Sequence, residues 1–249
     1  MEGNINNYNL ESIEQEKLKK LLNIQISFAN KAQELNSISK EDSLLGYTSI
    51  YRNILKLPRP ISKDNPVWHE FIDQYLASND FTNSAWEFVQ KHKSKEKKQG
   101  QEQKKKFGPF GYEYDPIKKS VILHFNSNGV RSMDPSNADV LRESLKLMFS
   151  DVRINYPEAI LFESTSWINT FLAKFFPKEF ITNAIIKDGW FKSESAWGQF
   201  KTSSGIREKL IKKFLDKVEK AKNNEDLQNA FPYQVLYAKC SIEDIYKLY

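Results

Sequence analysis

The chain has 249 residues, 40% of them hydrophobic and 13% aromatic, which is enough for one large globular domain or two small ones. Its single cysteine, Cys240, excludes an internal disulfide and a four-cysteine zinc site, and favours a reducing, cytoplasmic setting. Neither a signal-peptide pattern nor the ~20 consecutive apolar residues of a membrane span occurs, so we expect a soluble protein that contacts no membrane.

The net charge of +5 and the pI of 9.0 come from one segment. Residues 91–106 hold eight lysines and two glutamates, a sum of +6, which leaves about −1 for the rest of the chain. Lysine and glutamine bury too little apolar area to offset the entropy of ordering, so we expect a flexible linker. The alternative is a weak contact with a polyanion such as nucleic acid, made by Lys91, Lys93, Lys95, Lys97, Lys98, Lys104, Lys105 and Lys106.

Before this segment the apolar pattern is helical. Apolar residues recur every three or four positions in four stretches, which predicts amphipathic helices over 9–38, 39–57, 65–78 and 80–93. Ser39 and Asn65 are the expected caps of the second and third helices, because short polar side chains accept hydrogen bonds from the first free N–H groups. Residues 1–90 are therefore predicted to be all-helical.

After residue 106 strands alternate with helices. Residues 110–114 and 120–125 flank the turn DPIKK and predict a β-hairpin. Further strands are predicted over 158–164 and 233–240, and helices over 134–157, 167–176, 205–224 and 241–249. This order indicates an α+β or α/β fold, in which the all-helical amino-terminal third packs on a small mixed sheet flanked by helices. Residues 107–249 are expected to form one globular unit with the helical region.

Motifs that fix a reaction class are missing. The sequence contains no G-x-x-x-x-G-K-[ST] loop, no G-x-G-x-x-G loop and no G-x-S-x-G elbow, so no cofactor is identified. The histidines His69, His92 and His124 are far apart, and none has a second ligand at zinc spacing. Carboxylates that converge from distant positions remain compatible with a magnesium site.

Two polar residues close predicted apolar strands. His124 lies in VILHFNSN, just before a polar loop, and Glu163 closes AILFE before STSW begins a helix. Strand ends are where open α/β sheets gather ligands, so we expect His124 and Glu163 to be catalytic, as an acid/base pair. The competing interpretation is structural: a satisfied histidine, and serine or threonine hydroxyls that cap the following helix.

Four further residues complete the predicted site. Ser166, Trp167, Trp197 and Gln199 are expected to bind substrate, because they are polar or aromatic groups set among apolar residues. The helical spacing of Trp167 equally favours a position in the hydrophobic core, and a core position is also the alternative for Trp197. If His124, Glu163 and Gln199 converge, the protein is a small-molecule enzyme. If they do not, a non-catalytic protein that binds another protein or a polyanion is the other class.

Several short landmarks carry a resemblance. GYTSIYRNILKLP, PVWHEFIDQYL, SWINTFLAKFFP, WGQF and IYKLY resemble the recurring landmarks of a family of uncharacterised bacterial proteins, along most of the chain. The chain is also similar, at His124, Ser166, Trp167 and Pro177, to the carboxy-terminal domain of GNAT-like acyltransferases. The glycine-bearing pyrophosphate loop of that family is missing, which argues against acyl transfer.

Overall fold

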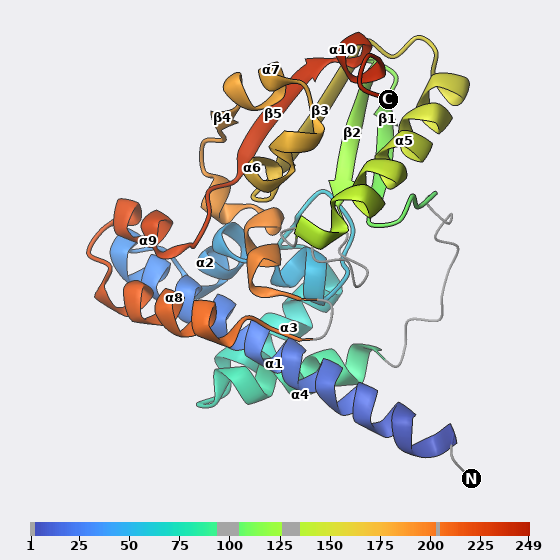
Figure 1. The fold of residues 1–249 in the computed structure, drawn as a ribbon. Helices are drawn as coiled ribbons and strands as arrows, with labels where there is room; N and C mark the ends of the chain where they lie inside the picture. Colours follow the sequence, from blue (N-terminus) through green and yellow to red (C-terminus); the bar gives the residue numbers. More distant parts are fainter. Residues whose placement is uncertain (1–2, 94–104, 126–134, 203–204) are drawn as a thin grey trace. The chain divides into compact units, whose positions relative to one another are not determined.

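The computed structural model describes residues 3–93, 105–125, 135–202 and 205–249, and it has an α+β fold (Figure 1). The predicted fold class is therefore confirmed. Contacts between residues divide the chain into two compact units. Unit 1 comprises residues 1–99, 191–201 and 205–232, and unit 2 comprises residues 100–190, 202–204 and 233–249.

Unit 1 is helical, which confirms the predicted all-helical amino-terminal third. Its elements are α1 (Gly3–Asn36), α2 (Lys40–Tyr47), the π-helical turn η1 (Ile50–Ile54), α3 (Pro66–Leu76), α4 (Phe81–Lys93), the 3-10 helix η5 (Glu194–Phe200), α8 (Glu208–Lys220) and α9 (Asn224–Ala230). Both expected caps are present: the Ser39 side chain accepts from the Asp42 N–H, and the Asn65 side chain accepts from the N–H groups of Val67 and Trp68.

The helix predicted over 39–57 ends earlier than expected. The backbone is extended at Thr48, and its hydroxyl donates a 2.6 Å hydrogen bond to the Leu44 carbonyl. A threonine that satisfies a carbonyl of the last turn competes with continuation of the helix. The chain then resumes as η1, so one predicted helix is two short elements.

Aromatic side chains build the centre of unit 1. Phe28 of α1 lies 5.5 Å from Trp197, 5.7 Å from Phe214 of α8 and 5.2 Å from Phe231, measured between ring centroids. These contacts attach residues 191–201 and 205–232 to the amino-terminal helices, although the sequence analysis placed these residues with the carboxy-terminal region. The apolar area that these large rings bury decides which unit the residues join, even though the residues on either side along the chain belong to the other unit.

Unit 2 contains a five-stranded mixed sheet. Its strands are β1 (Phe110–Asp115), β2 (Ser120–Phe125), β3 (Leu161–Ser166), β4 (Ile185–Ile186) and β5 (Leu236–Ser241), in the order β1-β2-β3-β5-β4. Only β2 and β3 pair in parallel among these strands. The helical elements of unit 2 are η2 (Pro135–Asn137), α5 (Ala138–Asn155), α6 (Asn169–Leu172), η3 (Ala173–Phe175), α7 (Lys178–Thr182) and α10 (Ile242–Tyr246). The 3-10 helix η4 (Trp190–Lys192) is divided between the units: Trp190 belongs to unit 2, and the next two residues belong to unit 1.

Two sequence predictions need correction in unit 2. The strand predicted over 158–164 runs from Leu161 to Ser166, because antiparallel pairing with β5 continues past Glu163, which therefore lies mid-strand. The helix predicted over 167–176 is instead a short α6 followed by η3. The predicted hairpin is confirmed as β1 and β2.

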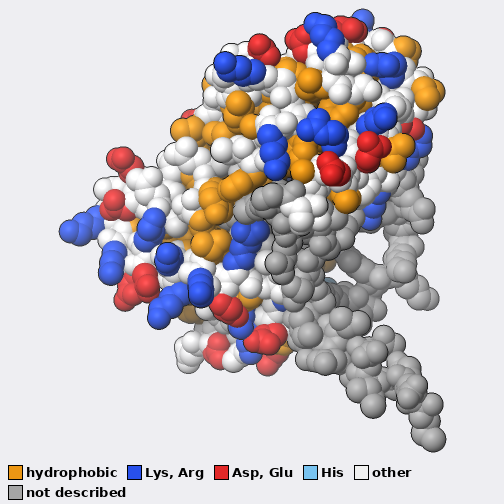
Figure 2. Space-filling model, viewed as in Figure 1, with side chains coloured by type: hydrophobic (Ala, Val, Ile, Leu, Met, Phe, Trp, Pro, Cys, Tyr) orange, Lys and Arg blue, Asp and Glu red, His pale blue; other side chains and the backbone are white. Residues whose placement is uncertain are grey.

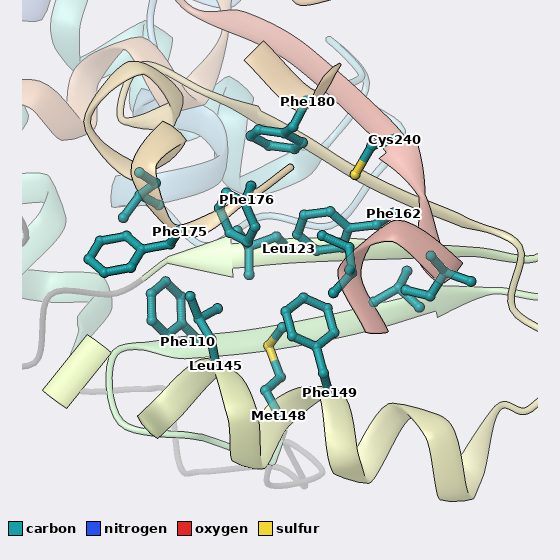
Figure 3. Close-up of a cluster of buried hydrophobic side chains, with 14 of the residues drawn as sticks. Phe110, Leu123, Leu145, Met148, Phe149, Phe162, Phe175, Phe176, Phe180 and Cys240 are labelled. Carbon is teal, nitrogen blue, oxygen red and sulfur yellow. The ribbon is translucent and has the colours of Figure 1, made fainter. Parts of the chain in front are cut away.

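The helices of unit 2 pack on one face of its sheet. Figure 3 shows Leu145, Met148 and Phe149 of α5 directed at the strands. Opposite them lie Phe110, Leu123, Phe162 and Cys240, which occupy alternate strand positions. Since successive side chains of a strand point to opposite faces, the intervening residues lie on the other face.

Candidate functional site

We call this other face the open face, because none of the described helices of unit 2 contributes to it a residue of the buried core. By strand alternation and register it carries Gly111, Glu113 and Asp115 of β1, Ser120, Ile122 and His124 of β2, Leu161, Glu163 and Thr165 of β3, Ile185 of β4, and Tyr237, Lys239 and Ser241 of β5. Four of these residues are charged (Glu113, Asp115, Glu163 and Lys239), whereas the alternate strand positions, which face the helices, include no charged residue.

Glu163 is the centre of a hydrogen-bond network on the open face. Its Oε1 accepts from the Ser120 hydroxyl at 2.8 Å, and its Oε2 accepts from the Tyr237 hydroxyl at 2.6 Å. The network therefore joins three neighbouring strands: β2, β3 and β5. Only 6% of Glu163 and 0% of Ser120 is exposed, so both groups are held away from bulk water.

No cation balances this carboxylate within the described part of the chain. Lys239 is directly opposite Glu163 in the β3–β5 register, but it is exposed and forms no ion pair with it. A buried charge without a counter-ion costs several kcal/mol of desolvation, which the two hydroxyl donors offset in part. A carboxylate has about four acceptor positions, and the hydroxyls occupy two of them.

Burial raises the pKa of the Tyr237 phenol to about 12, and the hydrogen bond to Glu163 acts in the same direction. Tyr237 thus stays protonated and donates to the carboxylate at neutral pH. Neither Tyr237 nor Ser120 was predicted as a site residue. The alternation of side chains along a strand could have indicated Ser120, because Ser120, Ile122 and His124 are two positions apart in β2 and therefore lie on one face.

His124 shares the open face with Glu163 but has a different partner. Its Nε2 lies 3.3 Å from Oε2 of Glu113, and the side chains are 50% and 55% exposed. Ile122 is opposite Glu163, so His124, two positions along β2, is a diagonal neighbour roughly 8 Å away between Cα atoms. The structure brings the two predicted catalytic residues onto one face, with separate hydrogen-bond partners.

Ser166 and Trp167 have local contacts at the end of β3. The Ser166 hydroxyl oxygen accepts from the Ile168 N–H at 3.3 Å, which stabilises the turn into α6. The Trp167 ring stacks on Tyr233 at 5.5 Å and meets the edge of Phe171 at 6.2 Å, and all three rings are partly buried. The packing alternative therefore accounts for Trp167. The capping alternative is not met, because the cap residue of α6 is Ile168 and no side chain caps this helix.

Trp197 and Gln199 belong to unit 1, whereas His124 and Glu163 belong to unit 2. Trp197 is 1% exposed inside the aromatic cluster, and Gln199 is 0% exposed. The indole N–H of Trp197 has no acceptor among the described residues. Core packing therefore accounts for Trp197, and neither side chain presents a surface to solvent.

The lysine-rich segment is described only at its ends. Lys91 pairs with Glu70 and Lys105 with Asp151, each at 2.8 Å, and Lys106 is exposed. Lys95, Lys97, Lys98, Lys104 and the side chain of Lys93 lie outside the described residues. Two lysines of the predicted polyanion contact thus already have carboxylate partners.

Other chemistries receive no support from the described residues. These contain no group of three or more His, Cys, Asp or Glu residues that could hold a metal ion. Burial raises the pKa of the free Cys240 thiol to about 12, so this cysteine is a poor nucleophile at neutral pH. None of the described helices combines the length and the apolar character that crossing a membrane requires.

In comparisons with protein-family models, curated proteins and solved structures, nothing matches this chain. The two resemblances noted from short landmarks therefore stay predictions.

Proposed function

We propose that this protein binds a small, positively charged organic molecule on the open face of unit 2, with Glu163 as the anchoring carboxylate. The observation that carries the proposal is a carboxylate with 6% exposure that no cation of the described chain neutralises. An amine, guanidinium or quaternary ammonium group would supply that missing charge, and an N–H donor would use the acceptor positions that the two hydroxyls leave.

The charges of the open face support a cationic ligand. Glu113, Asp115 and Glu163 contribute −3 and Lys239 contributes +1, so the face carries −2 with His124 counted as neutral. Ile122, opposite Glu163 on β2, and Leu161, two positions before it on β3, provide partly buried aliphatic surface next to the carboxylate. A few polar anchors among apolar neighbours are typical of small-molecule sites.

We extend the proposal to a catalytic role for His124 and to a cytoplasmic location. His124 is exposed on the same face as Glu163, so it is the residue that would transfer a proton to or from a bound molecule. A cytoplasmic setting is part of the proposal, because the only cysteine is a free thiol.

A binding experiment with Glu163→Gln tests the function. Glutamine keeps the size of the side chain and removes the charge. Its carbonyl oxygen can accept from one of the two hydroxyls, and its NH2 group can donate to the oxygen of the other. We expect at least one member of a panel of primary amines, guanidines and quaternary ammonium ions to raise the melting temperature of the wild type. At a ligand concentration 10 to 100 times Kd, binding should raise the free energy of unfolding by about 1.4–2.7 kcal/mol.

The same ligand should give no shift with Glu163→Gln, and a smaller but measurable shift with the control Glu113→Gln. A neutral alcohol of the same shape should not bind. Equal binding to wild type and Glu163→Gln, or no shift with any member of the panel, would overturn the proposal.

A further inference from the structure

A second charged surface lies on α8 of unit 1, independent of the proposed ligand site. Every exposed position of this helix is charged: Glu208, Lys209, Lys212, Lys213, Asp216, Lys217, Glu219 and Lys220. Figure 2 shows lysine side chains gathered along α8, with acidic side chains among them. Glu208 is neutralised by Lys20 of α1, so five lysines face two remaining acids, for a net charge of +3.

The backbone of α8 is held in place by its opposite side. Ile211, Phe214 and Val218 are buried, and the Phe214 ring lies 5.0 Å from Phe231 and 5.9 Å from Trp197. Because the core already covers these apolar residues, they cannot insert into a lipid bilayer. The helix can therefore act on a partner only through its charged face.

The lysines are available for an anionic partner. Within the described residues, no carboxylate forms an ion pair with Lys209, Lys212, Lys213 or Lys220. Lys217 donates to the Asn229 carbonyl at 2.9 Å and keeps its charge. Eleven residues separate Lys209 from Lys220, which is about 16 Å of helix.

From these five exposed lysines we infer that α8 is a contact surface for the phosphate backbone of nucleic acid. One strand of duplex DNA carries a phosphate about every 3.4 Å along the axis, or about five phosphates in 16 Å, and α8 presents five lysines over that length. The exposed positions include no Arg, Asn or Gln, the side chains whose planar groups pair bidentately with base edges, so we expect mainly lysine–phosphate contacts that do not depend on sequence.

The test uses the full chain and a fluorescein-labelled 20-base-pair DNA duplex of arbitrary sequence, with binding followed by anisotropy over a salt series. We compare wild type with the triple variant Lys209→Gln, Lys213→Gln, Lys220→Gln. Loss of three phosphate contacts should weaken binding roughly tenfold to a few hundredfold near 0.1 M salt. It should also reduce the slope of log K against log salt by about 2.7.

A matched control removes the same charge elsewhere. Lys146, Lys178 and Lys187 of unit 2 are exposed, and their triple glutamine variant should bind as wild type does within about twofold. The variant Asp216→Asn removes an acid from the α8 face, and it should strengthen binding about two- to eightfold. A gain of affinity cannot result from unfolding.

Three outcomes would overturn the inference. One is that the two triple variants lose affinity equally, which would indicate a net-charge effect. Another is that deletion of residues 91–106 abolishes binding while the α8 triple variant binds like wild type, which would assign the contact to that segment. The third is that wild type binds phosphatidylserine vesicles but not the duplex, which would make a membrane surface the partner.

Discussion

The Tyr237 hydroxyl donates a 2.6 Å hydrogen bond to Oε2 of Glu163 across the β3–β5 pair, while Ser120 of β2 donates to Oε1 of the same carboxylate. One buried side chain thus links three strands. Without these two hydrogen bonds, the sheet would bury a negative charge that has no hydrogen-bond donor.

Removal of either donor should destabilise unit 2. Tyr237→Phe or Ser120→Ala leaves one oxygen of a buried carboxylate without its hydroxyl, which costs about 1–3 kcal/mol in free energy of unfolding. The control is Lys239→Gln, because this exposed lysine forms no ion pair with Glu163 and should change stability by less than about 0.5 kcal/mol. Urea unfolding followed by circular dichroism measures all three. A loss for Lys239→Gln as large as for Tyr237→Phe would contradict the network.

Stability should fall at high pH in a way that depends on Tyr237. The folded state raises the pKa of this phenol from 10.0 to about 12, chiefly by burial, and so favours its protonated form. The stabilisation is then complete below pH 10 and is lost as the pH rises through 12. The difference in urea midpoint between wild type and Tyr237→Phe should narrow over this range. Other buried tyrosines titrate in both proteins, so a constant difference would show that the phenol is not coupled to folding.

Trp197 should behave as a core residue of unit 1. Its ring lies within 6.1 Å of Phe28, Phe200, Phe214 and Phe231, so Trp197→Ala should cost about 3–5 kcal/mol. Trp197→Phe should cost markedly less, because phenylalanine keeps ring contacts and removes a buried N–H that lacks an acceptor. Leu76→Ala, at a residue 49% exposed, is the control and should stay within about 0.5 kcal/mol. Full stability in Trp197→Ala would restore the ligand-binding interpretation of this residue.

Two glycines give opposite predictions. Gly108 has a positive φ of 58°, and a Cβ there would collide with the Ser144 hydroxyl, so Gly108→Ala should destabilise by about 1–3 kcal/mol. Gly46 lies in α2 with nothing within 4 Å of an added Cβ, so Gly46→Ala should stabilise by about 0.5–1 kcal/mol. Thermal unfolding of the two variants checks both signs. The same sign in both would mean that backbone conformation does not distinguish these positions.

Much of the local structure follows from short-range pattern. The 3.6-residue apolar period predicted the helical amino-terminal third, and alternation around DPIKK predicted the hairpin of β1 and β2. Ser39 and Asn65 cap their helices as expected, and Ser241 caps α10 in the same way. Element ends were less predictable: a Thr48 hydroxyl ended one helix early, and pairing with β5 carried β3 on to Ser166.

The candidate site was only partly predictable. The sequence singled out Glu163 and His124 because a charged or titratable group in an apolar strand is unusual. Ser120 and Tyr237 were missed, since alternation assigns each residue to a face of its own strand but does not show which strands are neighbours. Trp197 and Gln199 were grouped with the same site, yet they are buried in the other unit.

The sequence by itself determined the helix and strand periodicity, the caps and the polarity of the strand residues, because each depends on residues a few positions apart. It limited the fold class to α+β or α/β. Only the tertiary structure decided which strands are neighbours, and hence that Ser120, Glu163 and Tyr237, distant along the chain, share one hydrogen-bond network. It also decided that residues 191–201 and 205–232 pack with the amino-terminal helices. The reason is that long-range partners are selected by the summed burial of apolar surface and the satisfaction of buried polar groups, which no local window of sequence contains.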